Sequence, residues 1–243
     1  MFYSARALAH LAADAHVAAS CAAADRALLL PPLEAFGLPV SWYASETTAA
    51  YGFHYEGDRR IMRQESVGNP WTPEHALEAV GDAGWIHVGA LVRTDFPEGT
   101  LAALAEGGRR LLVDGQGLVR LPALGPLHTD GEIGVVLRHV TVLKLNEEEA
   151  ETLVGSAEPE RLRALGVPEV ILTLGSKGSF VVTESAVVHV PAKEIGGPVD
   201  PTGAGDTFAA GYLTARSRGA ESVEAAHVGA EEVAAFLAAG RGS

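Results

Sequence analysis

Several features that mark other classes of protein are scarce or absent in this sequence. Cys21 is the only cysteine among 243 residues, so no disulfide can form within the chain and no thiolate metal site is supported. No apolar run reaches the roughly 18 residues that cross a bilayer, and no secretory signal is recognisable. From these absences we expect a soluble, cytoplasmic protein.

Positive charge is also scarce. The chain has 18 Lys and Arg residues against 31 Asp and Glu, which gives a formal net charge of −13. A surface of this sign repels polyanions, so it argues against nucleic acid or an anionic membrane as a partner. An anionic substrate such as a nucleotide would need local neutralisation, by Mg²⁺ or by helix N-termini.

Common catalytic signatures are missing as well. The sequence has no Walker A string, no His-Glu-x-x-His, no Cys-x-x-Cys and no Gly-x-Ser-x-Gly. No Gly-x-Gly-x-x-Gly follows an early strand, which disfavours a dinucleotide-binding oxidoreductase. No repeat or low-complexity linker marks a second domain. The hydrophobic content of 47% is ordinary for a globular chain, so residues 1–243 are expected to form a single domain.

What is present is an alternation of short apolar runs and helical segments. Expected strands are Val17–Cys21, Trp85–Val88, Arg110–Val113, Val140–Leu145, Glu169–Thr173, Phe180–Thr183 and Val187–Val190. Expected helices are Ser4–Ala13, Asp25–Phe36 with a break at Pro31-Pro32, Pro97–Ala105, Asp130–Arg138, Glu147–Val154, Glu158–Leu165 and Ser222–Ala239. The rhythm predicts an α/β fold of three layers, a mostly parallel sheet between helices. Ligands of such sheets bind at the carboxyl ends of the strands.

The stretch 200–211, Asp-Pro-Thr-Gly-Ala-Gly-Asp-Thr-Phe-Ala-Ala-Gly, predicts a loop that runs into a helix. Thr202 is expected to cap this helix. Gly203 and Gly205 have no Cβ, so a ligand can approach their backbone closely. Together with Ala204 they place N–H groups at a helix start, where anions bind.

Asp206 follows these N–H groups directly. A carboxylate is common in a first helical turn, so this residue alone fits a structural role. It also fits a base that holds the hydroxyl attacking a bound phosphate. The twelve-residue string resembles the C-terminal signature of the ribokinase-like (PfkB) carbohydrate and nucleoside kinases. The resemblance implies that Asp206 is the catalytic base, and that the backbone of Gly203, Ala204 and Gly205 forms the anion hole for the transferred phosphoryl group.

Two further strings sit at expected strand ends. The string from Asn146 to Glu149 is fully accounted for by a helix cap that is followed by acidic residues in the first turn. It also matches the family's Asn-x-x-Glu motif, which implies that Asn146 and Glu149 position Mg²⁺, largely through water. Asp114-Gly115-Gln116-Gly117 reads as a turn and also resembles the family's strand-end Asp loop.

The string 171–179, Ile-Leu-Thr-Leu-Gly-Ser-Lys-Gly-Ser, predicts a buried strand followed by a hairpin turn. Because it follows the Asn-x-x-Glu motif and precedes the Gly-Ala-Gly-Asp motif, it resembles the family's nucleotide-binding loop. His227 also lies near the family's adenine contact, although packing explains a histidine there equally well. The resemblance therefore implies donor-binding residues at Thr173, Gly175, Lys177, Thr202 and His227, and a monovalent-cation site, for K⁺, beside Asp200.

Residues 40–65 change to short extended segments with a hairpin turn at Glu56-Gly57-Asp58. This pattern fits either a sheet packed on the body or a small β lid over a ligand, and the stretch 47–59 resembles the lid strands of inositol-type kinases. The edge of such a lid often makes a homodimer contact. Arg59 and Arg60 are expected to be solvated turn residues.

The family comparison also concerns the start of the sequence. In the family a strand and a loop with two adjacent glycines precede the first helix, whereas this sequence opens at Met1-Phe2-Tyr3, already at the helix. Either the start is recorded too late in a longer protein, which we favour because the transfer motifs are intact, or this is a natural variant with a reduced acceptor site. We expect the 243-residue form to bind ATP, to phosphorylate poorly and to self-associate.

The resemblance implies an ATP-dependent phosphotransferase that moves the γ-phosphoryl group to a hydroxyl of a sugar, an inositol-like polyol or a nucleoside. Its cofactors would be ATP and Mg²⁺, and its partners small molecules. The alternative is a nucleotide-binding protein that has an incomplete acceptor site and little or no kinase activity.

Overall fold

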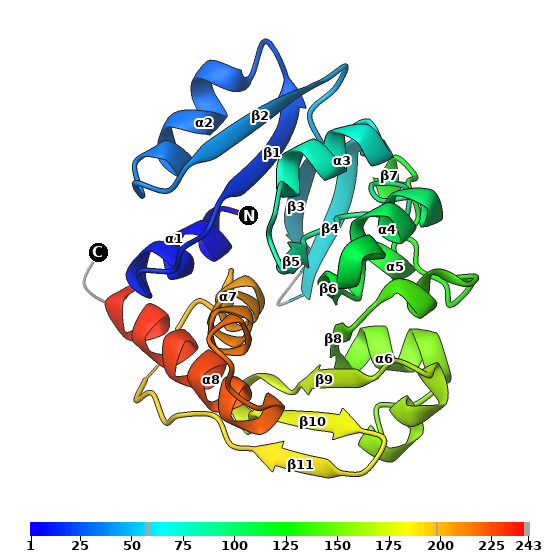
Figure 1. Ribbon diagram of the computed structural model, residues 1–243, viewed down its shortest axis with the longest axis vertical. Helices are drawn as coiled ribbons and strands as arrows, with labels where there is room; N and C mark the ends of the chain where they lie inside the picture. Colours follow the sequence, from blue (N-terminus) through cyan, green and yellow to red (C-terminus); the bar gives the residue numbers. More distant parts are fainter. Residues whose placement is uncertain (57–58, 198, 241–243) are drawn as a thin grey trace.

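The computed structural model describes residues 1–56, 59–197 and 199–240, which form three sheets and their covering helices (Figure 1). The strands are β1 (Val17–Ala22), β2 (Val40–Ser45), β3 (Ala50–Glu56), β4 (Arg59–Ser66), β5 (Trp85–Val88), β6 (Arg110–Asp114), β7 (Gly125–Pro126), β8 (Val142–Asn146), β9 (Glu169–Thr173), β10 (Ser179–Thr183) and β11 (Val187–Val190). The α-helices are α1 (Phe2–His10), α2 (Arg26–Glu34), α3 (Pro73–Val80), α4 (Glu98–Ala105), α5 (Gln116–Val119), α6 (Glu147–Val154), α7 (Ala204–Ser217) and α8 (Ser222–Ala239). No helix in the described part of the chain combines the length and apolar character needed to cross a bilayer.

The main sheet has six strands in the order β11-β10-β9-β8-β6-β5. Strands β5, β6, β8 and β9 are parallel, and β10 and β11 extend the sheet as antiparallel strands at one edge. In the register of β8 and β9, Asn146 lies opposite Thr173. Two residues expected to serve the site are therefore neighbours at the carboxyl edge of the sheet, where ligands of parallel sheets bind.

Helices cover both faces of this sheet, which confirms the expected three layers. Leu111 and Leu112 are consecutive on β6 and both fully buried, so their side chains fill opposite faces. Leu111 packs in a cluster with Leu104 of α4, whereas Leu112 packs with Phe208 of α7. Figure 1 shows α7 and α8 on one side of the sheet and α3, α4 and α6 on the other.

Two expected helices differ from the structure. The segment Asp130–Arg138 forms only a short 3₁₀ turn, η2 (Val136–His139), because Gly134 adopts a positive φ of 60°. Glu158–Leu165 is likewise a 3₁₀ helix, η3 (Pro159–Leu165). The expected break at Pro31-Pro32 is absent, since α2 continues through both prolines.

Strands β1 and β2 form a parallel pair of their own, separate from the six-stranded sheet. Their small core joins Val17 and Ala19 of β1 to Ala5 of α1 and Leu33 of α2. This pairing corrects the expected lid boundaries, because Val40–Ser45 belongs to the β1–β2 sheet and not to the lid segment 40–65. In Figure 1 the β1–β2 pair lies apart from β5, the edge strand of the six-stranded sheet, and no described strand joins the two sheets. This separation is called the gap between β1 and β5.

The rest of the expected lid is an antiparallel sheet of β3, β4 and β7. Phe53 of β3 is 54% exposed. The turn residues Gly57 and Asp58, and the side chains of Arg59 and Arg60, lie outside the described part of the chain. A lid function and a dimer contact at this sheet remain predictions.

Candidate functional site: the start of α7 and the strand ends beside it

Helix α7 begins one residue later than the sequence predicts. Gly203, at φ +85°, occupies the N-cap position, and Thr202 does not cap the helix. Thr202 instead donates from its N–H and its hydroxyl to Asp200 Oδ1, at 2.9 and 2.7 Å, which closes the loop before the helix. A Cβ on Gly203 would lie 2.2 Å from Cγ of the Tyr3 ring. Both backbone conformation and packing therefore require glycine at this position.

The first turn of α7 carries backbone N–H groups at the place where the anion hole is expected. The N–H of Ala204 donates to Pro201 O at 3.0 Å, so this group is already used. Among the described residues, the N–H groups of Gly205 and Asp206 have no backbone acceptor. Of the three expected donors, only the N–H of Ala204 is used within the described part of the chain, so the N–H groups of Gly203 and Gly205, together with that of Asp206, lie at the positive end of the α7 dipole.

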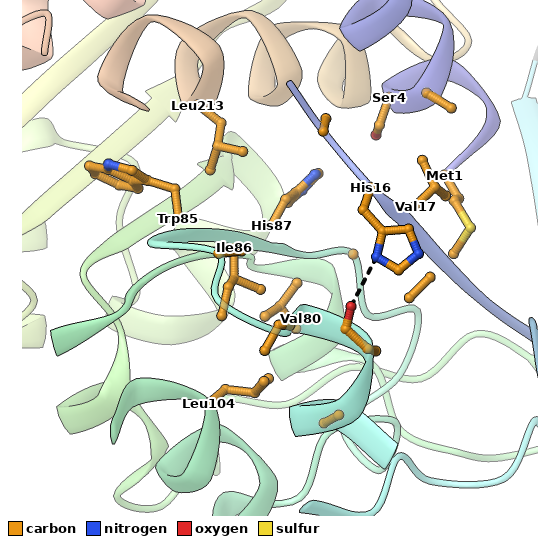
Figure 2. A pocket seen from close by; sticks show the side chains of 18 of the residues that line it. Met1, Ser4, His16, Val17, Val80, Trp85, Ile86, His87, Leu104 and Leu213 are labelled. Carbon is orange, nitrogen blue, oxygen red and sulfur yellow. Dashed lines mark hydrogen bonds between the residues drawn. The ribbon is translucent and has the colours of Figure 1, made fainter. Parts of the chain in front are cut away.

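Asp206 lies on the wall of a cavity of about 900 Å³. The cavity separates β1 from β5 and is also lined by α1, α3 and α7 (Figure 2). The Asp206 side chain is 31% exposed, and its Oδ2 lies 3.7 Å from the amino group of Met1. Asp206 therefore lies both on the cavity wall and in the first turn of α7, whose N–H groups favour an anion, and a role as a base remains a prediction.

Asn146 and Glu149 form a complete capping box at the start of α6. Asn146 Oδ1 accepts from the N–H of Glu149 at 2.8 Å, and Glu149 Oε2 accepts from the N–H of Asn146 at 3.0 Å. The capping explanation is therefore confirmed. Burial raises the pKa of the Glu149 carboxyl above its usual value, and the Lys144 ammonium partly opposes this effect. Among the described residues no three His, Cys, Asp or Glu side chains cluster as a metal site would require.

The remaining expected donor-site residues divide into two groups. Thr173 donates from its hydroxyl to Leu145 O at 3.0 Å, which ties it to the strand that ends at Asn146. Gly175 and Lys177 lie in the turn that follows, and the Lys177 ammonium is 3.8 Å from Glu147 of α6. These residues are brought together, whereas His227 is exposed on α8 and no described contact joins it to the strand ends.

Sequence reasoning singled out Asp114 but missed its two partners, His87 and Lys144, with which it forms a line of titratable residues near the start of α7. His87 Nε2 lies 2.7 Å from Asp114 Oδ2, and Asp114 Oδ1 accepts from the Lys144 ammonium. Burial alone would raise the pKa of Asp114, but Lys144 and His87 hold that pKa well below its usual value. The available signal was a lysine within the otherwise apolar run that becomes β8.

Comparisons with known proteins agree with this geometry. The family description "pfkB family carbohydrate kinase" matches residues 4–243. A nucleoside kinase of Methanocaldococcus jannaschii is 32% identical over 110 residues, which are 44% of this chain and 35% of that protein. A ribokinase of Bacillus subtilis is 28% identical over 183 residues, 75% of this chain and 59% of the relative. The matches thus span less than two thirds of these relatives.

Solved structures share the fold over nearly all of the chain. A pyrophosphate-dependent kinase in the ribokinase family, solved with sulfate, gives a TM-score of 0.84 at 22% identity and covers 97% of this chain and 85% of its own. The nucleoside kinase of Burkholderia thailandensis in complex with inosine gives 0.74 at 25% identity, with 97% and 78% covered. Because the family model matches residues 4–243, nearly the whole chain, this chain belongs to the pfkB family of carbohydrate kinases.

Proposed function

We propose that this chain transfers the γ-phosphoryl group of ATP to a hydroxyl of a sugar, a polyol or a nucleoside. The observation that carries the proposal is the position of Asp206, on a cavity wall and in the same helical turn as the N–H groups of Gly205 and Asp206. Phosphoryl transfer requires mainly that nucleophile and donor are aligned and that charge on the transferred group is stabilised. One turn of α7 provides both functions.

In this proposal Asp206 accepts the proton of the acceptor hydroxyl as the oxygen attacks the γ-phosphorus. The helix start stabilises the charge on the oxygens of the transferred group, because its N–H groups and dipole are fixed before the reaction. The cavity of about 900 Å³ holds the acceptor. Polar side chains on its wall, among them His87 and Gln116, would bind acceptor hydroxyls.

The strand ends would bind the donor. Thr173, Gly175 and Lys177 lie beside Asn146 at the carboxyl edge of the sheet, and the Lys177 side chain is 72% exposed, so a phosphate could reach it beside its ion pair with Glu147. Thr202 and His227 complete the proposed donor contacts, and Asp200 is the proposed neighbour of a monovalent cation.

Mg²⁺ fits this edge through Glu149 and Asn146, although both side chains already serve the capping box. Magnesium usually keeps several waters and takes only one or two protein carboxylates together with substrate phosphates. A single partly buried carboxylate beside the proposed phosphate site would meet that need through water. The ion would supply charge neutralisation on the donor phosphates, while Glu149 and Asn146 would orient its water ligands.

A specific observation also favours the alternative, a nucleotide-binding protein with an incomplete acceptor site. The cavity has strand edges on two sides, because β1 pairs only with β2 and β5 pairs only with β6 in the described part of the chain. An acceptor would lie between two sheets that no described strand joins. The proposed donor site does not include this region between the sheets, so the chain would bind a nucleotide even if it could not transfer the phosphoryl group.

The direct test is a matrix of donors and acceptors with the purified chain and Mg²⁺. Donors should include ATP and inorganic pyrophosphate, because one structural neighbour is described as pyrophosphate-dependent. Acceptors should include ribose, myo-inositol, inosine and cytidine. We expect phosphorylated product from ATP with at least one acceptor class. ATP binding without product from any acceptor would support the alternative, and neither binding nor product would refute both.

A further inference from the structure

The chain contains a buried lysine whose position the capping, packing and sheet pairing do not explain. Lys144 lies on β8, between Leu143 and Leu145, and is only 8% exposed. An apolar side chain is usual at such a position, because burying an ammonium is costly unless it is paired. The charge of the Lys144 ammonium must therefore be stabilised by groups next to it.

One partner is an acidic group on the adjacent strand. Asp114 of β6 lies opposite Lys144 in the register and accepts a hydrogen bond from its ammonium. Asp114 is shared, because its other oxygen meets His87 of β5 at 2.7 Å. Burial alone would lower the pKa of Lys144, but the carboxylates of Asp114, Glu149 and Asp206 raise it above its usual value. The ammonium is therefore charged at neutral pH.

The other side of the ammonium faces the start of α7. A Cβ built on Gly205 would lie 3.5 Å from Lys144 Nζ, and no other heavy atom beyond this lysine is that close. Asp114 is the only hydrogen-bond acceptor of Nζ among the described residues, whereas an ammonium has three donors. A cation held against the positive end of a helix is electrostatically unfavourable on its own. An anion placed between the two would be attracted by both.

We propose that Lys144 is a catalytic residue of this chain, whose ammonium contacts the phosphoryl group while that group rests at the start of α7, and that Asp114 and His87 are positioning residues that aim it. This inference rests on the proposed function, which it deepens by naming the cation that neutralises the transferred group from beneath the helix. Lys144 gives and takes no proton in this role. Glycine at 205 leaves the space through which the ammonium reaches the anion.

The test uses a pair of substitutions that leaves net charge unchanged. The double variant Lys144→Met with Asp114→Asn removes the buried ion pair as a unit, which is tolerated better than the loss of one partner. Asn at 114 still has an oxygen to pair with His87. The matched control is Lys193→Met with Glu231→Gln, which removes an exposed ion pair of 3.0 Å. Circular dichroism and thermal unfolding establish that both double variants are folded.

Binding of inorganic pyrophosphate, measured by calorimetry without an acceptor, is the first readout. We expect the Lys144/Asp114 variant to lose affinity about tenfold or more, the scale of one hydrogen bond to a charged group, and the control to stay within about twofold. Where turnover is measurable, kcat should fall more than the donor KM rises. Unchanged pyrophosphate affinity in the folded variant, or no affinity in the parent, would overturn the inference. Loss of affinity without any transfer by the parent would instead leave it standing and refute only the proposed kinase activity.

Discussion

At the scale of single residues, Glu149 combines a structural and a proposed catalytic role. Its carboxylate closes the capping box of α6 and also lies close enough to Lys144 to affect that residue's pKa. The capping bonds fix the direction of the side chain, so a role in orienting magnesium waters would add to the cap and not replace it. The two roles predict different results on substitution.

We predict that Glu149→Gln raises the Mg²⁺ concentration needed for half-maximal activity by about tenfold, with a smaller change in ATP affinity. Gln retains an acceptor for the N–H of Asn146 but loses the charge that attracts the ion. Magnesium titration of turnover is the measurement. Glu148→Gln, the same change on an exposed neighbour in the same turn, is the control. An unchanged magnesium requirement would show that Glu149 acts only in the capping box.

Glu169 is a second residue whose environment makes a measurable prediction. Burial raises the pKa of its carboxyl to about 7, although Arg216 opposes the effect from 3.6 Å. Below the ordinary value of 4.5, folded and unfolded chains both carry the proton, so this group does not affect stability. As pH rises to about 7, the unfolded chain loses the proton first, and folding becomes progressively less favourable.

The variant Glu169→Gln cannot ionise, so we predict that its melting temperature relative to the parent rises between pH 5 and pH 8. Thermal unfolding across this range is the measurement. Glu184→Gln, which removes an exposed carboxylate, is the control. A difference between Glu169→Gln and the parent that stays constant over the range would show that the buried carboxyl does not bind its proton more tightly in the fold.

At the scale of elements, the start of α7 depends on one glycine. Gly203 has φ +85° and the Tyr3 ring lies against it, so α1 and α7 meet there. We predict that Gly203→Ala lowers the free energy of unfolding by about 2 kcal/mol or more, because it adds backbone strain to a steric clash.

Chemical denaturation is the measurement for Gly203→Ala. Adding Tyr3→Ala relieves the clash but not the strain, so the double variant should regain only part of the loss. Gly205→Ala is the matched comparison, since its Cβ would meet no atom closer than 3.5 Å. Equal stability of Gly203→Ala and Gly205→Ala would contradict the account of this helix start.

The elements predicted from sequence are those with strong local signals. Trp85–Val88, Glu169–Thr173 and Glu147–Val154 are found with the predicted bounds, because an apolar run or a capping box defines each one. The helix predicted over Asp130–Arg138 was wrong because Gly134 adopts a positive φ, and hydrophobic periodicity does not indicate such a bend in the backbone. The prediction that Thr202 caps α7 was wrong because its N–H and hydroxyl both donate to the Asp200 carboxylate.

The site was predictable where a contiguous motif defines it. Gly203, Gly205 and Asp206 fall on one turn, as the string 200–211 predicts. The contacts that join His87, Asp114 and Lys144 could not be predicted, because the three residues lie on three strands whose order is set only by the folded sheet.

At the scale of the whole molecule, β1 and β5 are the facing edge strands of two separate sheets, with the cavity between them. Each strand leaves one edge without a described partner, and open edges favour pairing with another chain. Met1, the N-cap residue of α1, lies beside Asp206, and β1 follows α1 in the chain.

We predict that extending the chain upstream by one apolar strand and a glycine-containing loop reduces self-association and raises acceptor turnover. The reason is that the added strand would cover both edges and complete the cavity wall beside Asp206. Light scattering and steady-state turnover of both forms are the measurements, with a polar extension of equal length as the control. Equal size and equal turnover would show that the gap is not a defect of the acceptor site.

The central claim is that Asp206 is the base of a phosphoryl transfer. Its most direct test is turnover by Asp206→Asn, with the acceptor found in the screen and with ATP binding measured in parallel. The account predicts that turnover falls by roughly a hundredfold or more, the scale of a positioned base, while ATP affinity stays nearly intact. Turnover within twofold of the parent would remove Asp206 from the mechanism and contradict the account.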